Sequence, residues 1–213
     1  MKLKKVASLC TGSKIFRLYD RTDADGVVEQ WLGDASAAYP MRGLPYLDEE
    51  NLYRIFDVPE KTQDKMFFNH GPMPEGINVD DFANGERLAE DSGMTISFGG
   101  TVLLPLRYSG GILYIQTKYL APLDDQLNYL QLYVRRTESG GRYIAAKAGM
   151  LLVAVIFPYD AIREGFVDKL DEIAGLTRRE LEKRRNGAVG PQAVDETQQR
   201  LFEEKTEGGD CEP

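Results

Sequence analysis

The sequence has little of the chemistry that most enzymes use. His70 is the only histidine among 213 residues, so no Ser-His-Asp or Cys-His arrangement can be assembled without it. It stands in "FFNHG", where a strand runs into a turn, and we expect it to be structural or merely exposed. No G-x-x-x-x-G-K-[ST] loop and no strand-anchored G-x-G-x-x-G occurs, so phosphate-loop and dinucleotide sites lack their motif. We predict a non-enzymatic protein that uses no cofactor.

Cysteines and long apolar runs are also scarce. The two cysteines, Cys10 and Cys211, make neither a disulfide framework nor a metal pair. No run of about 18 apolar residues occurs, so no transmembrane segment is expected. The N-terminal "MKLKKVASLC" has lysines but no apolar stretch of signal-peptide length behind them. These features predict a cytoplasmic protein with no membrane partner.

The sequence has fewer basic residues than acidic ones, 26 against 34. The formal net charge is -8, whereas hydrophobic residues make up 42% of the chain and can supply a core. A uniformly acidic surface repels nucleic acid, so contact with DNA would need a local basic patch.

Carboxylates are plentiful, but their spacing does not make a metal site. An EF-hand loop built on "DRTDADG" would have Arg21 at its first ligand position and Leu32 at its last. We therefore expect a polar hairpin turn that ends at Gly26. A metal-dependent hydrolase or nuclease stays open as a third alternative on the carboxylates of the central loop. These are Asp80, Asp81, Glu90 and Asp91. We predict no metal site.

The chain contains an internal repeat. "LYDRTDADG" begins at Leu18 and "LYVRRTESGG" begins at Leu132, and the shift of 114 residues also places Lys4 on Lys118. The alternative is that any two hairpins with Tyr, Arg, Thr and Gly look alike.

The predicted elements follow the same order in both copies. In the first copy they are a helix at 2–10, strands at 14–20, 27–33 and 36–41, and a helix at 47–58. In the second they are a strand at 111–116, a helical turn at 117–125, strands at 129–136, 142–148 and 150–158, and a helix at 163–176. The section 66–108 is a linking loop and a hairpin, with strands at 94–98 and 101–108 joined by "GG".

This order predicts the fold class and the domains. We expect an α+β fold made of a duplicated helix/β-hairpin unit with a pseudo-twofold, with antiparallel sheets and helices on one face. A single duplicated domain would span 1–175, with repeat 1 at about 1–60 and repeat 2 at about 112–175. Residues 176–213 would form a charged helical extension and a flexible tail.

The second copy contains the stretches "GILYIQTKYLAPLDDQLNYLQLYV" and "YIAAKAGMLLVAVIFPYD". Together they resemble the last repeat of a bacterial DNA sliding clamp. Clamp domains consist of two such units related by a pseudo-twofold, and their helices present lysine and arginine to DNA phosphates. The resemblance implies four candidate DNA-facing residues: Lys2, Lys4, Lys5 and Lys118. The alternative is an ordinary solvated helix face.

The chain departs from clamps in size. A clamp subunit has two or three such domains, whereas this chain has room for one, so a ring would need several copies. The sequence also resembles small proteins encoded by bacterial prophages and mobile elements.

The tail carries a short motif. In "QQRLF", Gln198, Leu201 and Phe202 resemble the Q-x-x-L-F peptide by which bacterial polymerases and repair proteins dock on the sliding clamp. Two apolar side chains on a polar tail can fill a hydrophobic pocket of a partner. The two middle positions, Gln199 and Arg200, depart from the family's usual residues. The alternative is that Leu201 and Phe202 fold back onto the protein itself.

These observations lead to two functional predictions. The first is a non-enzymatic DNA-replication accessory protein, with a clamp-like domain and a tail peptide that docks on a sliding clamp. Its expected partners are a bacterial sliding clamp or a second copy of the chain, together with double-stranded DNA bound without sequence preference. The alternative is a protein-interaction scaffold of a mobile element that makes no contact with DNA.

Overall fold

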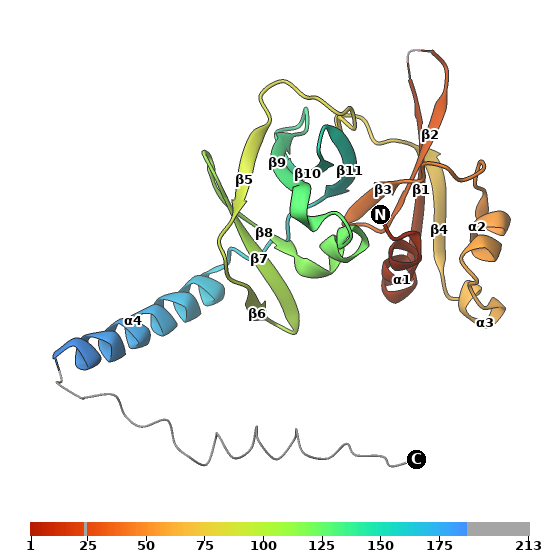
Figure 1. Ribbon diagram of the computed structural model, residues 1–213. Helices are drawn as coiled ribbons and strands as arrows, with labels where there is room; N and C mark the ends of the chain where they lie inside the picture. Colours follow the sequence, from red (N-terminus) through yellow and green to blue (C-terminus); the bar gives the residue numbers. More distant parts are fainter. Residues whose placement is uncertain (24, 187–213) are drawn as a thin grey trace, which may run out of the picture. The chain divides into compact units, whose positions relative to one another are not determined.

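A computed structural model describes residues 1–23 and 25–186, and the chain forms two compact units, Met1–Ala161 and Ile162–Pro213. The first unit is a mixture of helices and strands (Figure 1). Its helices are α1 (Leu3–Ser13), α2 (Glu49–Ile55), α3 (Glu60–Gln63) and the 3₁₀ helices η1 (Thr117–Leu123) and η2 (Leu127–Tyr129). Its strands are β1 (Ile15–Thr22), β2 (Val28–Gly33), β3 (Ala37–Pro40), β4 (Phe67–Pro72), β5 (Arg87–Asp91), β6 (Ile96–Phe98), β7 (Thr101–Tyr108), β8 (Gly111–Gln116), β9 (Leu130–Arg136), β10 (Arg142–Ala148) and β11 (Leu151–Ile156).

The strands form one large, mostly antiparallel sheet. Its order is β4-β1-β2-β3-β11-β10-β9-β5-β7-β6, and β8 pairs with β7. The pair β1–β4 is parallel. A mixed fold with a mainly antiparallel sheet is therefore confirmed.

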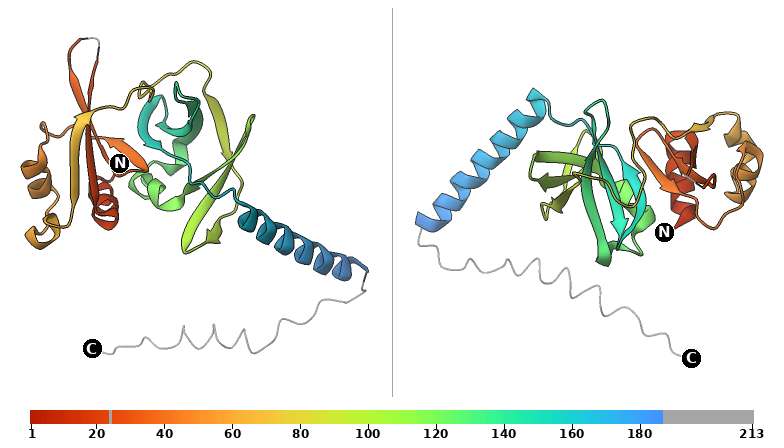
Figure 2. Two further views of the ribbon diagram at one scale, coloured as in Figure 1. Left: turned by 180° about the vertical axis from the view of Figure 1, so that it is seen from behind. Right: turned by 90° about the horizontal axis from the view of Figure 1, so that it is seen from above.

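Two three-stranded meanders make up the middle of the sheet (Figure 2). We call β1–β2–β3 the first meander and β9–β10–β11 the second meander. Their third strands pair antiparallel, Ala38 with Val155 and Ala37 with Ile156. α1 precedes the first meander and η1 precedes the second. A shift of 114 residues takes Leu18 in β1 to Leu132 in β9, and both are buried.

The strands form where apolar residues alternate or run together. In β1, Phe16 and Leu18 are buried while their neighbours are only half-buried, as the alternation predicts. In β11, every residue from Leu152 to Ile156 is buried, which confirms a strand covered on both faces. The turn between β6 and β7 has Gly99 and Gly100 at positive φ, the geometry that this two-residue hairpin requires.

Two groups of side chains cover the two faces of the meanders. The first core cluster contains residues from three helices: Val6 and Cys10 of α1, Leu52 and Tyr53 of α2, and Tyr119 and Leu123 of η1. The second core cluster contains Trp31 and Tyr143, with Met73, Ile77 and Val79 from the chain between β4 and β5. A connecting segment therefore covers the face opposite to the helices.

Three details differ from the predictions. The section 65–93, expected to be mostly loop, contains β4 and β5. In the predicted helix 47–58 the helical period places Ile55 on the apolar face, but Ile55 is 39% exposed in α2 and Tyr53 is buried instead. In the predicted helix 163–176 the same period places Ile173 inward, but Ile173 is 60% exposed.

The second unit contains α4 (Glu164–Asn186), so the polar sequence after Gly175 continues the helix as predicted. Among the described residues, no helix has both the length and the apolar character needed to cross a membrane.

Candidate functional site

The four predicted DNA-facing lysines lie on two neighbouring helices. α1 and η1 pack against each other, and the backbone N–H of Lys2 donates a hydrogen bond of 2.7 Å to the carbonyl of Pro122. Lys2, Lys4 and Lys118 are exposed and Lys5 is half-buried. We call Lys2, Lys4, Lys5 and Lys118 the lysine face.

A carboxylate from the end of η1 lies within this face. Asp124 accepts from Lys2 Nζ at 2.8 Å and from Lys5 Nζ at 2.5 Å. The hydrogen bonds from Lys2 and Lys5 lower the pKa of Asp124 to about 2, and the bond to Asp124 raises the pKa of Lys2. Two of the four lysines are therefore already matched by a negative charge.

The other two lysines make different contacts. Lys118 Nζ lies 4.8 Å from the centre of the Tyr119 ring, a cation–π contact. Lys4 is exposed on α1, on the side where Lys4, Ser8 and Phe56 line an open hollow of about 480 Å³. Lys4 and Lys118 are therefore the members of the lysine face best placed to meet a phosphate.

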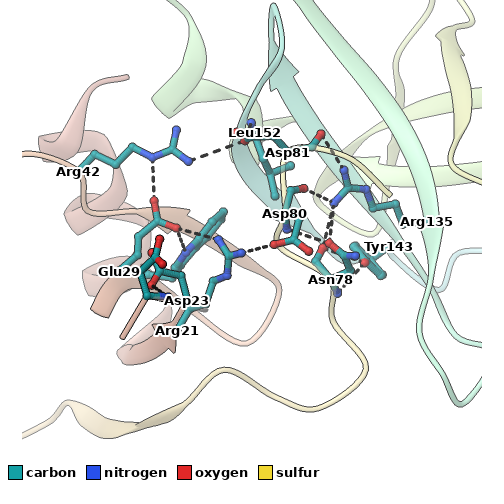
Figure 3. Close-up of polar contacts among 12 residues, drawn as sticks. Arg21, Asp23, Glu29, Arg42, Asn78, Asp80, Asp81, Arg135, Tyr143 and Leu152 are labelled. Carbon is teal, nitrogen blue, oxygen red and sulfur yellow. Dashed lines mark hydrogen bonds and ion pairs between the residues drawn. The ribbon is translucent and has the colours of Figure 1, made fainter. Parts of the chain in front are cut away.

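A second polar site lies at the other end of the first meander. An open cavity of about 650 Å³ is lined by charged residues and by the exposed apolar residues Val27, Val28 and Tyr46. Arg42 Nε donates to Glu29 at 2.8 Å, and Arg21 pairs with both Glu29 and Asp80 (Figure 3). Both arginines are thus held by carboxylates of the protein itself.

Arg135 fixes the segment that supplies Asp80 and Asp81 to this cavity. Its guanidinium donates to the carbonyl oxygens of Asn78 at 3.0 Å, Asp80 at 2.8 Å and Asp81 at 3.3 Å. The Asp81 side chain accepts in turn from the backbone N–H of Leu152 at 2.7 Å. The segment Asn78–Glu86 is therefore attached to the second meander, and it also pairs with Arg21 of β1 and with Arg42, two residues after β3 (Figure 3).

A group of three charges, two buried cations and the half-buried Glu86, completes the attachment. Glu86 pairs with Arg135 at 2.8 Å and with Lys147, and the two cationic side chains are only 2% and 5% exposed. Burial raises the pKa of Glu86, but the hydrogen bonds from Lys147 and Arg135 outweigh it and lower the pKa overall. Each charge has a partner, as burial of an ion requires.

The only histidine belongs to a small polar network. His70 Nε2 lies 3.0 Å from Asp20, which also accepts from Gln30 at 2.9 Å and Tyr46 at 2.8 Å. Burial raises the pKa of Asp20, but these three donors outweigh it and lower the pKa. His70 thus contacts Asp20 in a network that also contains Gln30 and Tyr46.

The four carboxylates considered for a metal-dependent hydrolase or nuclease each contact a different partner. Asp80 and Asp81 bind the groups described above, Glu90 lies 3.7 Å from Arg107, and Asp91 accepts from the N–H of Gly93. Within residues 1–23 and 25–186, no cluster of three or more His, Cys, Asp or Glu side chains could hold a metal ion. At the first hairpin, Asp23 accepts from Asp25 and Val27 N–H groups, which makes the predicted polar turn.

The predicted tail motif, Gln198, Leu201 and Phe202, lies outside the described residues. The network around Arg135 and Glu86 was not predicted. The signal for it was Lys147 inside the apolar run "YIAAKA", because a lysine at a strand position buried on both sides needs an opposite charge.

Comparison with known proteins adds no relative: no family model, no curated protein and no solved structure matches the chain.

Proposed function

We propose that this protein is a non-enzymatic accessory protein of DNA replication that contacts duplex DNA through the lysine face and docks on a sliding clamp through its tail. The observation that carries the proposal is the side-by-side packing of α1 and η1. It gathers lysines from positions 114 residues apart, Lys4 and Lys118, onto adjacent helices. A surface that meets phosphates without reading sequence needs this kind of local positive charge.

The strand order supports the clamp-like part of the proposal. The sequence β1-β2-β3-β11-β10-β9 reads the same from both ends if β1 is matched with β9, β2 with β10 and β3 with β11. A helix precedes β1 and another precedes β9, and the two helices touch. A pseudo-twofold through the β3–β11 pair would relate the two halves, which is the arrangement that the resemblance to clamps implies.

The test of DNA contact compares two variants with the same change of charge. Lys4→Glu/Lys118→Glu alters the lysine face, and Lys61→Glu/Lys65→Glu alters exposed lysines near α3. Binding to a fluorescent duplex of random sequence is titrated from about 50 to 200 mM salt. We expect the first variant to bind more weakly and to lower the slope of log K against log salt by about two, while the second behaves as wild type.

A third variant is designed to strengthen DNA binding by the lysine face. Asp124→Asn removes the carboxylate that Lys2 and Lys5 share, so more positive charge becomes available to phosphates. DNA binding should become tighter and its salt slope steeper. If duplex binding is absent in wild type and Asp124→Asn alike, the DNA contact is wrong.

The clamp-docking part is tested separately with a purified bacterial sliding clamp. Leu201→Ala/Phe202→Ala should abolish binding, whereas Val194→Ala, an apolar tail residue outside the motif, should not. Equal binding by both variants would remove the tail motif from the proposal.

The second candidate is an interaction scaffold that makes no contact with DNA. Two observations favour it: Asp124 and Asp125 place carboxylates beside the lysines, and the net charge of the chain is -8. Clamp binding without any DNA binding would select this candidate.

A further inference from the structure

α4 carries an apolar line that the described residues leave largely exposed. Leu170, Ile173, Thr177 and Leu181 are three or four residues apart, so they share one side of the helix. Ile173 is 60% exposed and Leu181 is 56% exposed. We call Leu170, Ile173, Thr177 and Leu181 the α4 stripe. Large apolar side chains in a line mark a contact surface more than the same residues scattered singly would.

The charges of α4 are divided along its length. Residues 164–172 hold four carboxylates and one lysine, a net charge of -3. Residues 178–185 hold five cations and two carboxylates, a net charge of +3. The net charges of the two segments are thus opposite in sign and equal in magnitude.

This division is compatible with stabilisation of a single helix, because acidic residues at the N-terminus and basic residues at the C-terminus complement the helix dipole. The dipole gives no reason for the exposed stripe. Gly175 in the interior of α4 disfavours the helix, and in proteins the packing of an apolar face supplies most of a helix's stability. A second copy of the same helix, running in the opposite direction, would cover the stripe and stabilise the helix.

We propose that α4 pairs with α4 of a second copy of the chain, antiparallel, through the α4 stripe. With Thr177 at the twofold axis, Ile173 lies opposite Leu181 of the second copy. The acidic half of each helix then lies along the basic half of the other, with Asp171 near Arg185 of the second copy. A parallel pair would place like charges together. This self-association goes beyond the proposed function and does not depend on it.

The experiment is sedimentation velocity on the full chain over a wide range of concentration. Wild type should shift from the mass of one chain towards that of two as concentration rises. Ile173→Ser should remain a monomer to much higher concentration. Leu176→Ser is the matched control, because Leu176 is 52% exposed on the same helix. At about 100° per residue it points about 100° away from the middle of the stripe. This control should dimerise as wild type does.

Charge reversal and cross-linking test the orientation. Arg185→Glu should weaken the dimer at low salt, and Asp171→Lys/Arg185→Glu should restore it. In a Cys211→Ser background, a mixture of Ile173→Cys and Leu181→Cys chains should form the mixed disulfide in preference to either symmetric one. Far-ultraviolet circular dichroism checks that each variant keeps its helix. A wild type that stays monomeric at every concentration, or a dimer that Ile173→Ser and Leu176→Ser affect equally, overturns the proposal.

Discussion

Arg135 Nε donates a hydrogen bond of 2.9 Å to Oε2 of Glu86, which lies 49 residues earlier in the chain. This contact joins the second meander to the segment that crosses to the first, and Lys147 binds the other carboxylate oxygen of Glu86. The ladder between the meanders consists of two residue pairs, and the segment Asn78–Glu86 adds a polar connection to it and to the shared core. Stability should therefore depend on this buried ion group.

We expect Glu86→Gln to lower the free energy of unfolding by about 3 kcal/mol, because removing one member of a buried ion group leaves the other charges uncompensated. The measurement is urea denaturation followed by the fluorescence of Trp31, which is fully buried and the only tryptophan. The matched control is Glu90→Gln, whose pair with Arg107 is about two-thirds exposed on both sides. That variant should change stability by less than about 1 kcal/mol. Equal effects of the two substitutions would contradict the role given to Glu86.

The same glutamate predicts a dependence on pH. The folded-state pKa of Glu86 is lowered from its ordinary value of 4.5, so its contribution is complete above that value and is lost as the pH falls. The stability difference between wild type and Glu86→Gln should stay constant near neutral pH and shrink below about pH 4.5. Denaturation curves at a series of pH values check this. A difference that grows on acidification would show that the folded-state pKa is raised instead.

Much of the sheet could be predicted from the sequence because the signal is local. Alternating apolar residues predict β1, and a continuous apolar run predicts β11, each within a few positions of the sequence. For β4 the sequence indicated only a strand end at "FFNHG", and β5 has no alternating or continuous apolar pattern; nearly all residues of both strands are exposed or half-buried. They are strands because β4 pairs with β1 and β5 pairs with β9, and these partners are distant in the chain.

The candidate sites show the same limit. The sequence predicted corresponding positions for Lys4 and Lys118, and the helices that carry them, α1 and η1, pack against each other. Asp124 could not be assigned to Lys2 and Lys5 in advance, because the contact depends on the packing of η1 beside α1. Lys147 signals the need for a buried partner, but only the fold identifies that partner as Glu86.

A second buried contact joins η1 to the turn between β2 and β3. The Tyr119 hydroxyl donates to Asp34 at 3.0 Å, and burial, which acts more strongly than its hydrogen bonds, raises the pKa of Tyr119 to about 12. Tyr119→Phe leaves one oxygen of a buried carboxylate without this donor. We expect a loss of about 1–3 kcal/mol, measured by the same denaturation. Tyr129→Phe, at a tyrosine that is 56% exposed, is the control and should be close to neutral. A neutral Tyr119→Phe would mean that Asp34 finds another donor.

The turn itself depends on a residue without a side chain. A β-carbon on Gly33 would lie 1.7 Å from the carbonyl oxygen of Ala37, far inside any allowed contact. Gly33→Ala therefore has to move the turn, and with it Asp34, whose carboxylate accepts from Ala37 N–H at 3.0 Å and from Tyr119. We expect a loss of at least about 2 kcal/mol.

The matched control for this substitution is Gly12→Ala in α1, where an added β-carbon meets nothing within 4 Å. Alanine favours a helix over glycine by up to about 1 kcal/mol, so Gly12→Ala should stabilise the protein. The two glycine variants thus carry the same chemical change and should shift the urea midpoint in opposite directions. A midpoint that Gly33→Ala leaves unchanged or raises would mean that the turn between β2 and β3 accommodates a β-carbon, and that the close approach of Gly33 to Ala37 does not determine the path of the chain there.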